Sequence, residues 1–172
     1  MTVRLRTLGP YAGDLDLRAV GALHQRSRAA TYAHILSPET LANGSAEAFG
    51  EWWRERWQWE RETHRLTVAE RDGEVVGFTY VGPSPTHGAV ELYGIHVDPG
   101  LVGTGVGRLL MANALAQLSE MGGERAVLWV LEDNERARHF YARGGWYEDG
   151  ATRVEPVSNE PVRQLRYSRA LR

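Results

Sequence analysis

The chain has 172 residues, 42% of them hydrophobic and 24% charged, which is the length and balance of one folded domain with a buried core. It has no cysteine, which excludes disulfides, thiolate metal sites and a cysteine nucleophile. The net charge of −2 and the absence of a long apolar run exclude a strong nonspecific hold on nucleic acid and a membrane-spanning helix.

The first part of the chain predicts one strand and two helices. Residues 3–8 alternate apolar and polar side chains, as in a half-buried strand. Asp14 is expected to cap a helix that reaches about Tyr32. Ser37 and Pro38 predict the start of a second, short helix, with the serine as its cap and the proline in its first position.

Residues 45–61 predict a third helix that is rich in tryptophan. At helical spacing its main face carries Phe49, Trp53 and Trp57. Trp52 and Trp59 are expected to widen that face. Two interpretations stay open, because the aromatic face can pack on a sheet or contribute one or two indoles to a substrate pocket.

Three strands are expected next. Residues 64–70 and 74–81 are strand-like, and the Asp-Gly pair at 72–73 between them is a strong hairpin signal. Residues 83–88 form a loop rich in proline and glycine, and residues 89–97 predict a third, apolar strand. Three consecutive strands in the middle of the chain predict a mixed sheet rather than regular alternation of strands and helices.

The last part of the chain returns to alternating elements. Apolar residues at helical spacing predict a helix over 105–121, and residues 125–131 predict a buried strand. Asn134 is expected to cap a helix that ends near Arg143. The final strands are expected at 146–147 and 162–167. The arginines 163, 166, 169 and 172 predict that the last of these strands is a solvated edge.

A glycine-rich turn joins the third middle strand to the following helix, where residues 97–111 read VDPGLVGTGVGRLLM. Such a turn predicts a phosphate site, and three designs are possible. A P-loop needs a lysine after the glycines, and all twenty basic residues here are arginine. A dinucleotide fingerprint needs G-x-G-x-x-G, whereas this turn has G-x-G-x-G; a nicotinamide-cofactor protein stays a weaker alternative. The third design holds a pyrophosphate on backbone N–H groups at a helix N-terminus.

Two motifs in this region resemble the GNAT superfamily of acetyl-CoA-dependent N-acetyltransferases. Residues 102–107, VGTGVG, are similar to the family motif (Gln or Arg)-x-x-Gly-x-(Gly or Ala). Residues 134–146 are similar to Asn-x-x-Ala-x-x-(Phe)-Tyr-x-x-x-Gly-Phe. Two positions depart from the family pattern, since Val102 replaces Gln or Arg and Trp146 replaces Phe.

The resemblance implies one N-acetyltransferase domain over residues 1–172, of α/β (α+β) class with the GNAT fold. That fold is a splayed mixed sheet of six to seven strands flanked by helices. It further implies acetyl-CoA as co-substrate in the cleft at the splay, with no metal. The residues that would contact the coenzyme are Ile95, His96, Val97, Val102, Gly103, Thr104, Gly105, Val106, Gly107, Arg108, Asn134 and Tyr141.

The resemblance also implies catalytic roles. Glu91 would be the general base, the alternative being an exposed carboxylate at a strand end. His96 could also act as base, although a packed or hydrogen-bonded histidine is the simpler expectation. Tyr141 would be the general acid for the coenzyme A thiolate, or else an aromatic side chain buried by its helix. Asn134 can both cap its helix and bind the pantetheine arm.

The expected reaction is direct attack of a primary amine on acetyl-CoA, and the amine belongs to a small molecule or a peptide N-terminus. A catalytically silent acyl-CoA sensor is the alternative. We expect no nucleic acid or membrane partner, and a homodimer through residues 162–167 is possible. The histidines show no metal-ligand spacing. The N-terminus lacks the apolar core of a signal peptide, so a cytoplasmic location is expected.

Overall fold

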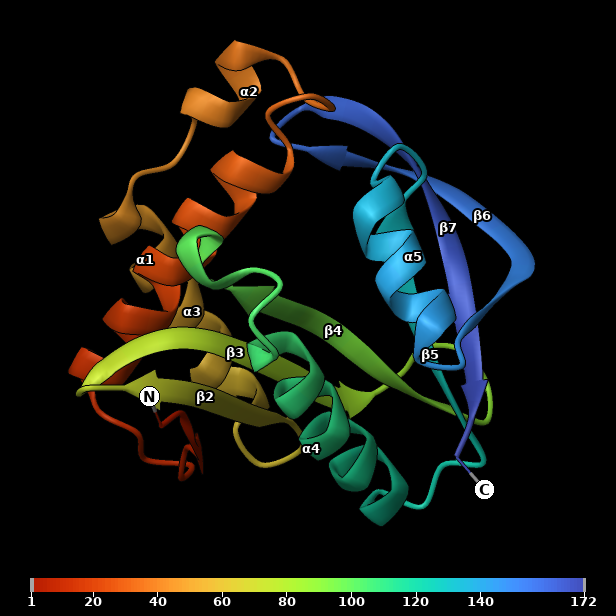
Figure 1. Cartoon of the computed structure of the whole chain (residues 1–172), viewed down its shortest axis with the longest axis horizontal. Coiled ribbons are helices and arrows are strands. Elements are labelled where there is room, and N and C mark those ends of the chain that lie inside the picture. Colours follow the sequence, from red (N-terminus) through yellow and green to blue (C-terminus); the bar gives the residue numbers. More distant parts are fainter. Residues whose placement is uncertain (1, 172) are drawn as a thin grey trace.

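A computed structural model describes residues 2–171 and contains one seven-stranded sheet in the order β1-β2-β3-β4-β5-β7-β6 (Figure 1). The strands are β1 (Arg4–Thr7), β2 (Arg65–Arg71), β3 (Glu74–Pro83), β4 (Ala89–Val97), β5 (Arg125–Leu131), β6 (Tyr147–Val157) and β7 (Glu160–Ala170). The helices are α1 (Asp14–Thr31), α2 (Pro38–Ala42), α3 (Ala46–Glu60), α4 (Val106–Glu120) and α5 (Glu135–Arg143), with a 3₁₀ turn η1 (Pro99–Leu101). The predicted mixed sheet flanked by helices is confirmed. Among these helices none is long and apolar enough to span a bilayer.

The sheet splays between β4 and β5. All other neighbouring strands are antiparallel, whereas β4 and β5 are parallel and pair at only three positions, from Ala89 to Glu91 on β4. Beyond Glu91, β4 stays paired with β3 as far as Val97, and β5 stays paired with β7. The two strands therefore diverge, and the opening between them widens along β4 (Figure 1).

A bulge in β4 lies next to the point of divergence. Tyr80 of β3 lies opposite Gly94, and the following residue, Val81, lies opposite Leu92, so Tyr93 is the extra residue. Bulges of this kind increase the local twist of a strand. The bulge therefore helps β4 turn away from β5 while it keeps its pairing with β3.

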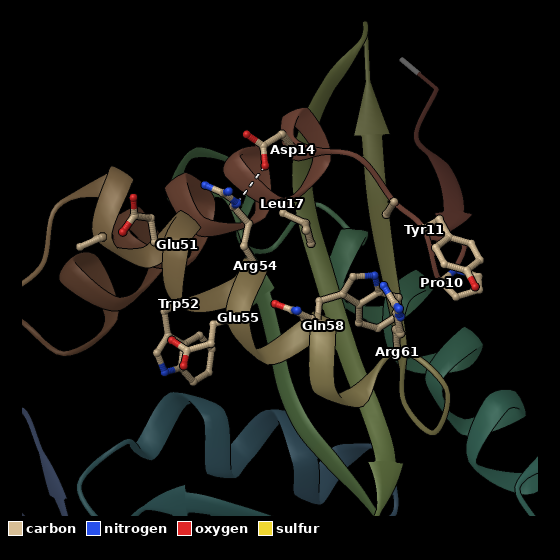
Figure 2. Close-up of a pocket in the computed structure, with 13 residues that line it drawn as sticks. Pro10, Tyr11, Asp14, Leu17, Glu51, Trp52, Arg54, Glu55, Gln58 and Arg61 are labelled. Carbon is tan, nitrogen blue, oxygen red and sulfur yellow. Dashed lines mark ion pairs between the residues drawn. The ribbon is translucent and has the colours of Figure 1, made fainter.

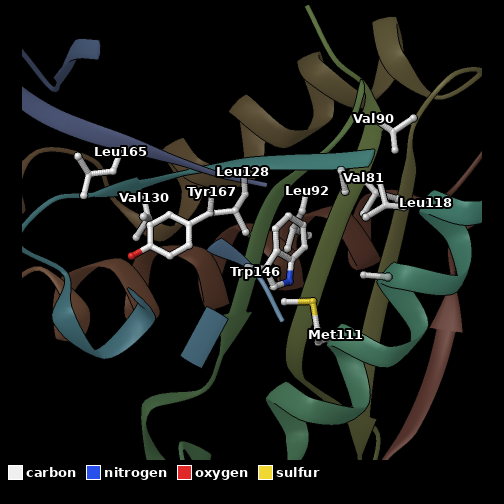
Figure 3. Packing of buried hydrophobic residues seen from close by; sticks show 12 residues of the cluster. Val81, Val90, Leu92, Met111, Leu118, Leu128, Val130, Trp146, Leu165 and Tyr167 are labelled. Atoms are coloured by element: carbon white, nitrogen blue, oxygen red, sulfur yellow. The ribbon is translucent and has the colours of Figure 1, made fainter. Parts of the chain in front are cut away.

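Helices cover the two halves of the sheet unequally. In Figure 1, α4 lies in front of β3 and β4, and α3 lies behind them; α5 lies over the β5–β7–β6 half, in front like α4. Trp53 and Trp57 of α3 pack with α1 on one face. On the other face Met111 and Leu118 of α4 pack with Trp146, which follows α5, and with β4, β5 and β7 (Figure 3).

Two expectations about the N-terminal helices are wrong. Trp52 and Trp59 do not widen the buried face of α3, because they are 46% and 80% exposed. At about 100° per residue they lie roughly a quarter turn or more from the seam formed by Trp53 and Trp57. Asp14 is the first helical residue of α1 rather than its cap, which is Gly13, and it pairs with Arg54 at 2.8 Å.

The C-terminal strands differ most from expectation. β6 and β7 are 11 residues long each and form one hairpin, whose turn lies at Ser158 and Asn159. Both turn residues have positive φ. Neither is glycine, so the turn carried no strong sequence signal. β7 lies between β5 and β6 and is paired on both sides, so the expectation that residues 162–167 form a free edge is wrong. Arg172 lies outside the described residues.

The crossing of α1 and α3 yields a stability prediction. A Cβ added at Gly21 would lie 2.3 Å from the backbone nitrogen of Gly50, so the two helix backbones are in contact. Gly21→Ala is expected to reduce the free energy of unfolding by about 1–3 kcal/mol, as for other overpacked sites. Urea unfolding measures this. Gly9→Ala is the control, because a Cβ there meets nothing within 4 Å. Equal midpoints for the two variants would contradict the close approach.

Candidate functional site

The splayed part of β4 presents an unpaired strand edge. From Leu92 onward β4 pairs with β3 alone, so the side that faces β5 has no strand partner. An open edge offers N–H and C=O groups to an extended ligand. The structure places Ile95, His96 and Val97, three of the predicted coenzyme contacts, in this segment. The side chains of Ile95 and Val97 are partly buried and pack against the core, so the polar groups that these two residues offer to a ligand are on the backbone.

The glycine turn follows at the open end of the splay. Asp98 Oδ1 accepts a hydrogen bond from the Gly100 N–H at 2.9 Å and shapes the η1 turn. Gly103 and Gly105 have φ of 84° and 101°, values that favour glycine. A Cβ at either position would meet nothing within 4 Å, so the surface of the turn is open to a ligand.

Most amides of this turn are unpaired. Leu101 and Thr104 donate their N–H groups within the turn, to Asp98 and Leu101. Within residues 2–171, six N–H groups have no acceptor: those of Val102, Gly103, Gly105, Val106, Gly107 and Arg108. They lie before and within the first turn of α4, where the helix dipole favours negative charge. The turn can therefore bind an anion without a cationic side chain.

Glu91 lies in the last parallel pair before the strands diverge, opposite Val127. It is 6% exposed, so the alternative of a solvent-exposed carboxylate is wrong. Burial raises the pKa of Glu91, while a hydrogen bond from Ser84 Oγ to Oε1 at 2.7 Å and nearby arginines, Arg153 foremost, lower it. A buried carboxylate with a raised pKa is suited to accepting a proton.

His96 is packed and hydrogen-bonded. Its ring stacks on Phe78 at 5.1 Å, lies 4.6 Å from the His24 ring, and has Nδ1 at 2.9 Å from Ser27 Oγ. Burial lowers the pKa of His96 to about 4. Its ring is therefore neutral at neutral pH, and so weak a base is poorly suited to accept a proton from an ammonium group. The expectation of a packed, hydrogen-bonded histidine is confirmed.

Helix α5 brings Asn134 and Tyr141 towards the glycine turn. Asn134 caps the helix, since its Oδ1 accepts from the Ala137 N–H at 3.3 Å, and its Nδ2 has no partner among the described residues. Tyr141 is half-buried beside Trp146, and its hydroxyl likewise makes no hydrogen bond within residues 2–171. Burial raises the pKa of Tyr141. The Phe140 ring lies 3.5 Å from where a Cβ on Gly107 would be, so α5 packs on the first turn of α4.

The β6–β7 hairpin contacts the N-terminal helices and so bridges the two diverging halves of the sheet. Arg28 at the end of α1 donates to Ser158 Oγ at 3.0 Å. The backbone N–H and the hydroxyl of Ser37, the cap of α2, both donate to Glu160 Oε2 at 3.1 Å. Segments from both halves of the molecule therefore touch each other through α1, α2 and the β6–β7 hairpin.

A hollow elsewhere on the surface is not this site. It lies between the start of α1 and the outer side of α3, and Trp52 and Tyr11 are among its lining residues (Figure 2). It contains neither Glu91 nor any residue of the glycine turn. The packing interpretation of Trp53 and Trp57 is confirmed, because both are 3% exposed in the core. Within residues 2–171 no group of three or more His, Cys, Asp or Glu side chains could hold a metal.

Sequence reasoning missed two polar neighbours of Glu91, Ser84 and Arg153, and also the Trp129 ring against which Arg153 lies. Ser84 lies in the 83–88 loop, and no pattern links it to a residue of the next strand. Arg153 and Trp129 reach the same side of the sheet only through the register of β5, β7 and β6. A search for polar residues on the predicted face of β5 would have found none, because Trp129 reads as an ordinary buried aromatic.

Comparisons with known proteins agree with this geometry. The model of the acetyltransferase (GNAT) family matches residues 29–146. A mycothiol acetyltransferase of Streptomyces avermitilis is 38% identical over 79 residues, which are 46% of this chain and 26% of that protein. An uncharacterized N-acetyltransferase of Archaeoglobus fulgidus is 36% identical over 92 residues, which are 51% of this chain and 63% of that protein. The chain therefore spans less than two thirds of the length of either relative.

A solved structure shows the same fold. The PaiA N-acetyltransferase of Thermoplasma acidophilum, crystallised in complex with coenzyme A, superposes with a TM-score of 0.72 over 99% of both chains. The two sequences are 18% identical, so this likeness concerns the fold alone. The fold expected from the glycine and asparagine motifs is confirmed.

The contact between Ser84 and Glu91 yields a prediction. The Ser84 hydroxyl stabilises the ionised carboxylate, so Ser84→Ala is expected to raise the pKa of Glu91 further above its ordinary value. Carbon-detected NMR titration of the Glu91 carboxyl measures it. Ser84→Thr keeps a hydroxyl and is the matched control. A pKa that is unchanged or lower in Ser84→Ala would show that the hydroxyl does not hold the carboxylate in solution.

Proposed function

The chain belongs to the GNAT acetyltransferase family, and we propose that it transfers the acetyl group of acetyl-CoA directly to the primary amine of a small molecule. The main support is the row of six unpaired amides at the open end of the β4–β5 splay, with the buried Glu91 carboxylate at its closed end. Family membership removes the nicotinamide-cofactor alternative. We further propose that the described sheet and its helices act as a single N-acetyltransferase domain.

Binding of the coenzyme would use mainly backbone groups. The unpaired amides from Val102 to Arg108 would hold the pyrophosphate, and the open edge of β4 at residues 95–97 would bind the pantetheine arm. The free Nδ2 of Asn134 offers one donor more. A backbone N–H of the same edge would hydrogen-bond the thioester oxygen, where negative charge develops during attack. Val102 is 39% exposed and adds no polar group to the pyrophosphate.

The chemistry would proceed by direct attack. The acceptor arrives as an ammonium ion and loses one proton to Glu91, directly or through water. Its nitrogen then bonds to the thioester carbon, the C–S bond breaks, and the nitrogen gives up its second proton to water as the amide forms. The leaving sulfur receives a proton from Tyr141, and Tyr141 and Glu91 then exchange protons with solvent. The net products are the amide, free coenzyme A and one proton.

The raised pKa of Tyr141 bears on its role. The phenol stays protonated through the neutral range, so its hydrogen is available when the sulfur becomes negative. A free thiol has a pKa near ~8.5, which makes complete transfer from a buried phenol uphill. Tyr141 therefore first stabilises the developing thiolate through a hydrogen bond, and the proton that it passes to the sulfur is replaced from solvent.

The contacts at the far end of the opening favour a small acceptor. Ser37 and Arg28 reach across to the β6–β7 turn, and the opening beneath them would have to admit the acceptor. An internal segment of a folded protein would have to break these contacts to bring its amine to Glu91. A small amine, or the end of a short peptide, would not.

The coenzyme site is tested by placing a negative charge in the turn. Gly105→Glu is expected to weaken acetyl-CoA binding about a hundredfold or more, because a carboxylate would repel the pyrophosphate. Val102→Gln should leave binding intact or tighten it by adding an amide donor. Isothermal titration calorimetry measures both. Gly122→Glu is the matched control, since Gly122 also has positive φ and open space at the other end of α4. Equal loss in both glutamate variants would point to backbone strain instead.

The catalytic assignments are tested by kinetics with an amine panel and detection of free thiol. Glu91→Gln is expected to lower kcat by about a hundredfold or more. In the unmodified protein kcat/KM should fall as the pH drops through the raised pKa of Glu91, because only the ionised form accepts a proton. Glu91→Gln should lose this acid limb.

Tyr141→Phe should lower kcat with little change in acetyl-CoA affinity.

The same panel decides between enzyme and sensor. If the unmodified protein binds acetyl-CoA but acetylates no amine, the sensor alternative is favoured. If Tyr141→Phe turns over at the unmodified rate, the role of Tyr141 is wrong even though the enzyme assignment stands.

A further inference from the structure

We propose, on the basis of the proposed transfer reaction, that the acceptor is a small amine that also carries an oxyanion, and that Arg153 binds this oxyanion. The group would be a carboxylate or a phosphate, which share the geometry that a guanidinium recognises. Arg153 would thus determine specificity without taking part in the chemical step.

The strand register places Arg153 and Glu91 on one face of the sheet. Glu91 pairs with Val127 on β5, and Trp129, two residues further, points to the same side. Trp129 pairs with Arg166 on β7, and Gln164, two residues away, pairs with Arg153 on β6. The opposite face of these strands is the core of Figure 3, to which Leu128, Val130, Leu165 and Tyr167 contribute.

Arg153 is held in place by neutral groups. Its Nε donates to Gln164 Oε1 at 2.7 Å, and its guanidinium lies 4.2 Å from the ring centroid of Trp129. An indole face attracts a cation but leaves its charge unneutralised. Partial burial lowers the pKa of Arg153, although the nearby carboxylates of Glu155 and Glu91 raise it.

The other arginines near Glu91 already have partners. Arg166 pairs with Asp149 at 2.7 Å, and Arg56 pairs with Glu60 on α3. Within residues 2–171 Arg153 forms no ion pair. Its remaining N–H groups are therefore free for a ligand, whereas those of Arg166 and Arg56 are largely committed.

This arrangement matches a molecule with two opposite charges. The ammonium would be directed to Glu91, which takes its proton, and the oxyanion to Arg153 across the splay. Trp129 supplies an apolar surface between β4 and β6 for the atoms that join the two groups. An amine without the oxyanion would leave the Arg153 charge unpaired in a cleft that the substrate has partly dehydrated, which costs binding energy.

The test compares amines that differ only in the oxyanion. The pairs are phenylalanine with phenethylamine, leucine with isoamylamine, and phosphoethanolamine with ethanolamine, with free thiol as the readout. We expect kcat/KM to be about ten- to hundredfold higher for the member that carries the oxyanion, in at least one kind of pair. The amino-acid pairs and the phosphate pair then show which oxyanion is bound. Arg153→Gln should abolish the preference by slowing only the member that carries the oxyanion, and Arg153→Lys should keep part of the preference.

Arg163→Gln is the matched control. Arg163 lies on β7 next to Gln164, so its side chain is on the opposite face, where it pairs with Glu132 at 3.3 Å. It should leave the preference unchanged. Equal rates within every pair for the unmodified protein would overturn the inference, as would an equal loss for both members in Arg153→Gln.

A separate binding measurement distinguishes this inference from the proposed reaction. Calorimetry of the same pairs with the coenzyme A-saturated full chain does not require turnover. If no amine is acetylated but the members that carry the oxyanion bind tighter and Arg153→Gln removes the difference, the reaction proposal fails and the oxyanion site stands. If neither member binds, or both bind equally, the oxyanion site is wrong.

Discussion

The fold and the site both depend on the limited pairing of β4 with β5, which covers only the three positions from Ala89 to Glu91. Beyond Glu91 each strand is bonded to another neighbour, β4 to β3 and β5 to β7. The facing edges of the two strands carry no ladder beyond this point, and the bulge at Tyr93 adds twist where the strands part. The strands therefore diverge and leave their facing edges unpaired, with Glu91 where the pairing ends and the glycine turn after the last residue of β4.

The electrostatics of this site come from fixed groups rather than from flexible charges. The turn from Val102 to Arg108 concentrates six unpaired amides at the start of α4, which explains how a chain without lysine can offer a phosphate site. Glu91 is the reverse case, a carboxylate whose ionised form is disfavoured by burial and supported by the Ser84 hydroxyl. Groups that are oriented before binding need little reorganisation during a reaction.

Sequence patterns predicted those parts of the protein whose structure is decided by near neighbours. Asp72 and Gly73 form the expected hairpin turn with positive φ, Ser37 caps α2, and Asn134 caps α5, each through local backbone geometry. The patterns failed where distant packing decides. The 3.6-residue period placed five aromatic residues on α3 but could not show that Trp52 and Trp59 face solvent. The turn between β6 and β7 consists of serine and asparagine, so the sequence did not predict the long hairpin.

The sequence by itself determined the family, the glycine turn that opens α4, and the position of Glu91 on the strand before it. These follow from residue types that only certain backbone conformations accept, and from spacing along one chain. The tertiary structure alone decided that Glu91 is buried, that His96 is packed and neutral, and that Arg153 shares a face with Glu91 although 62 residues separate them in the chain. Burial and charge depend on which strands lie side by side, and here the order β4-β5-β7-β6 sets both.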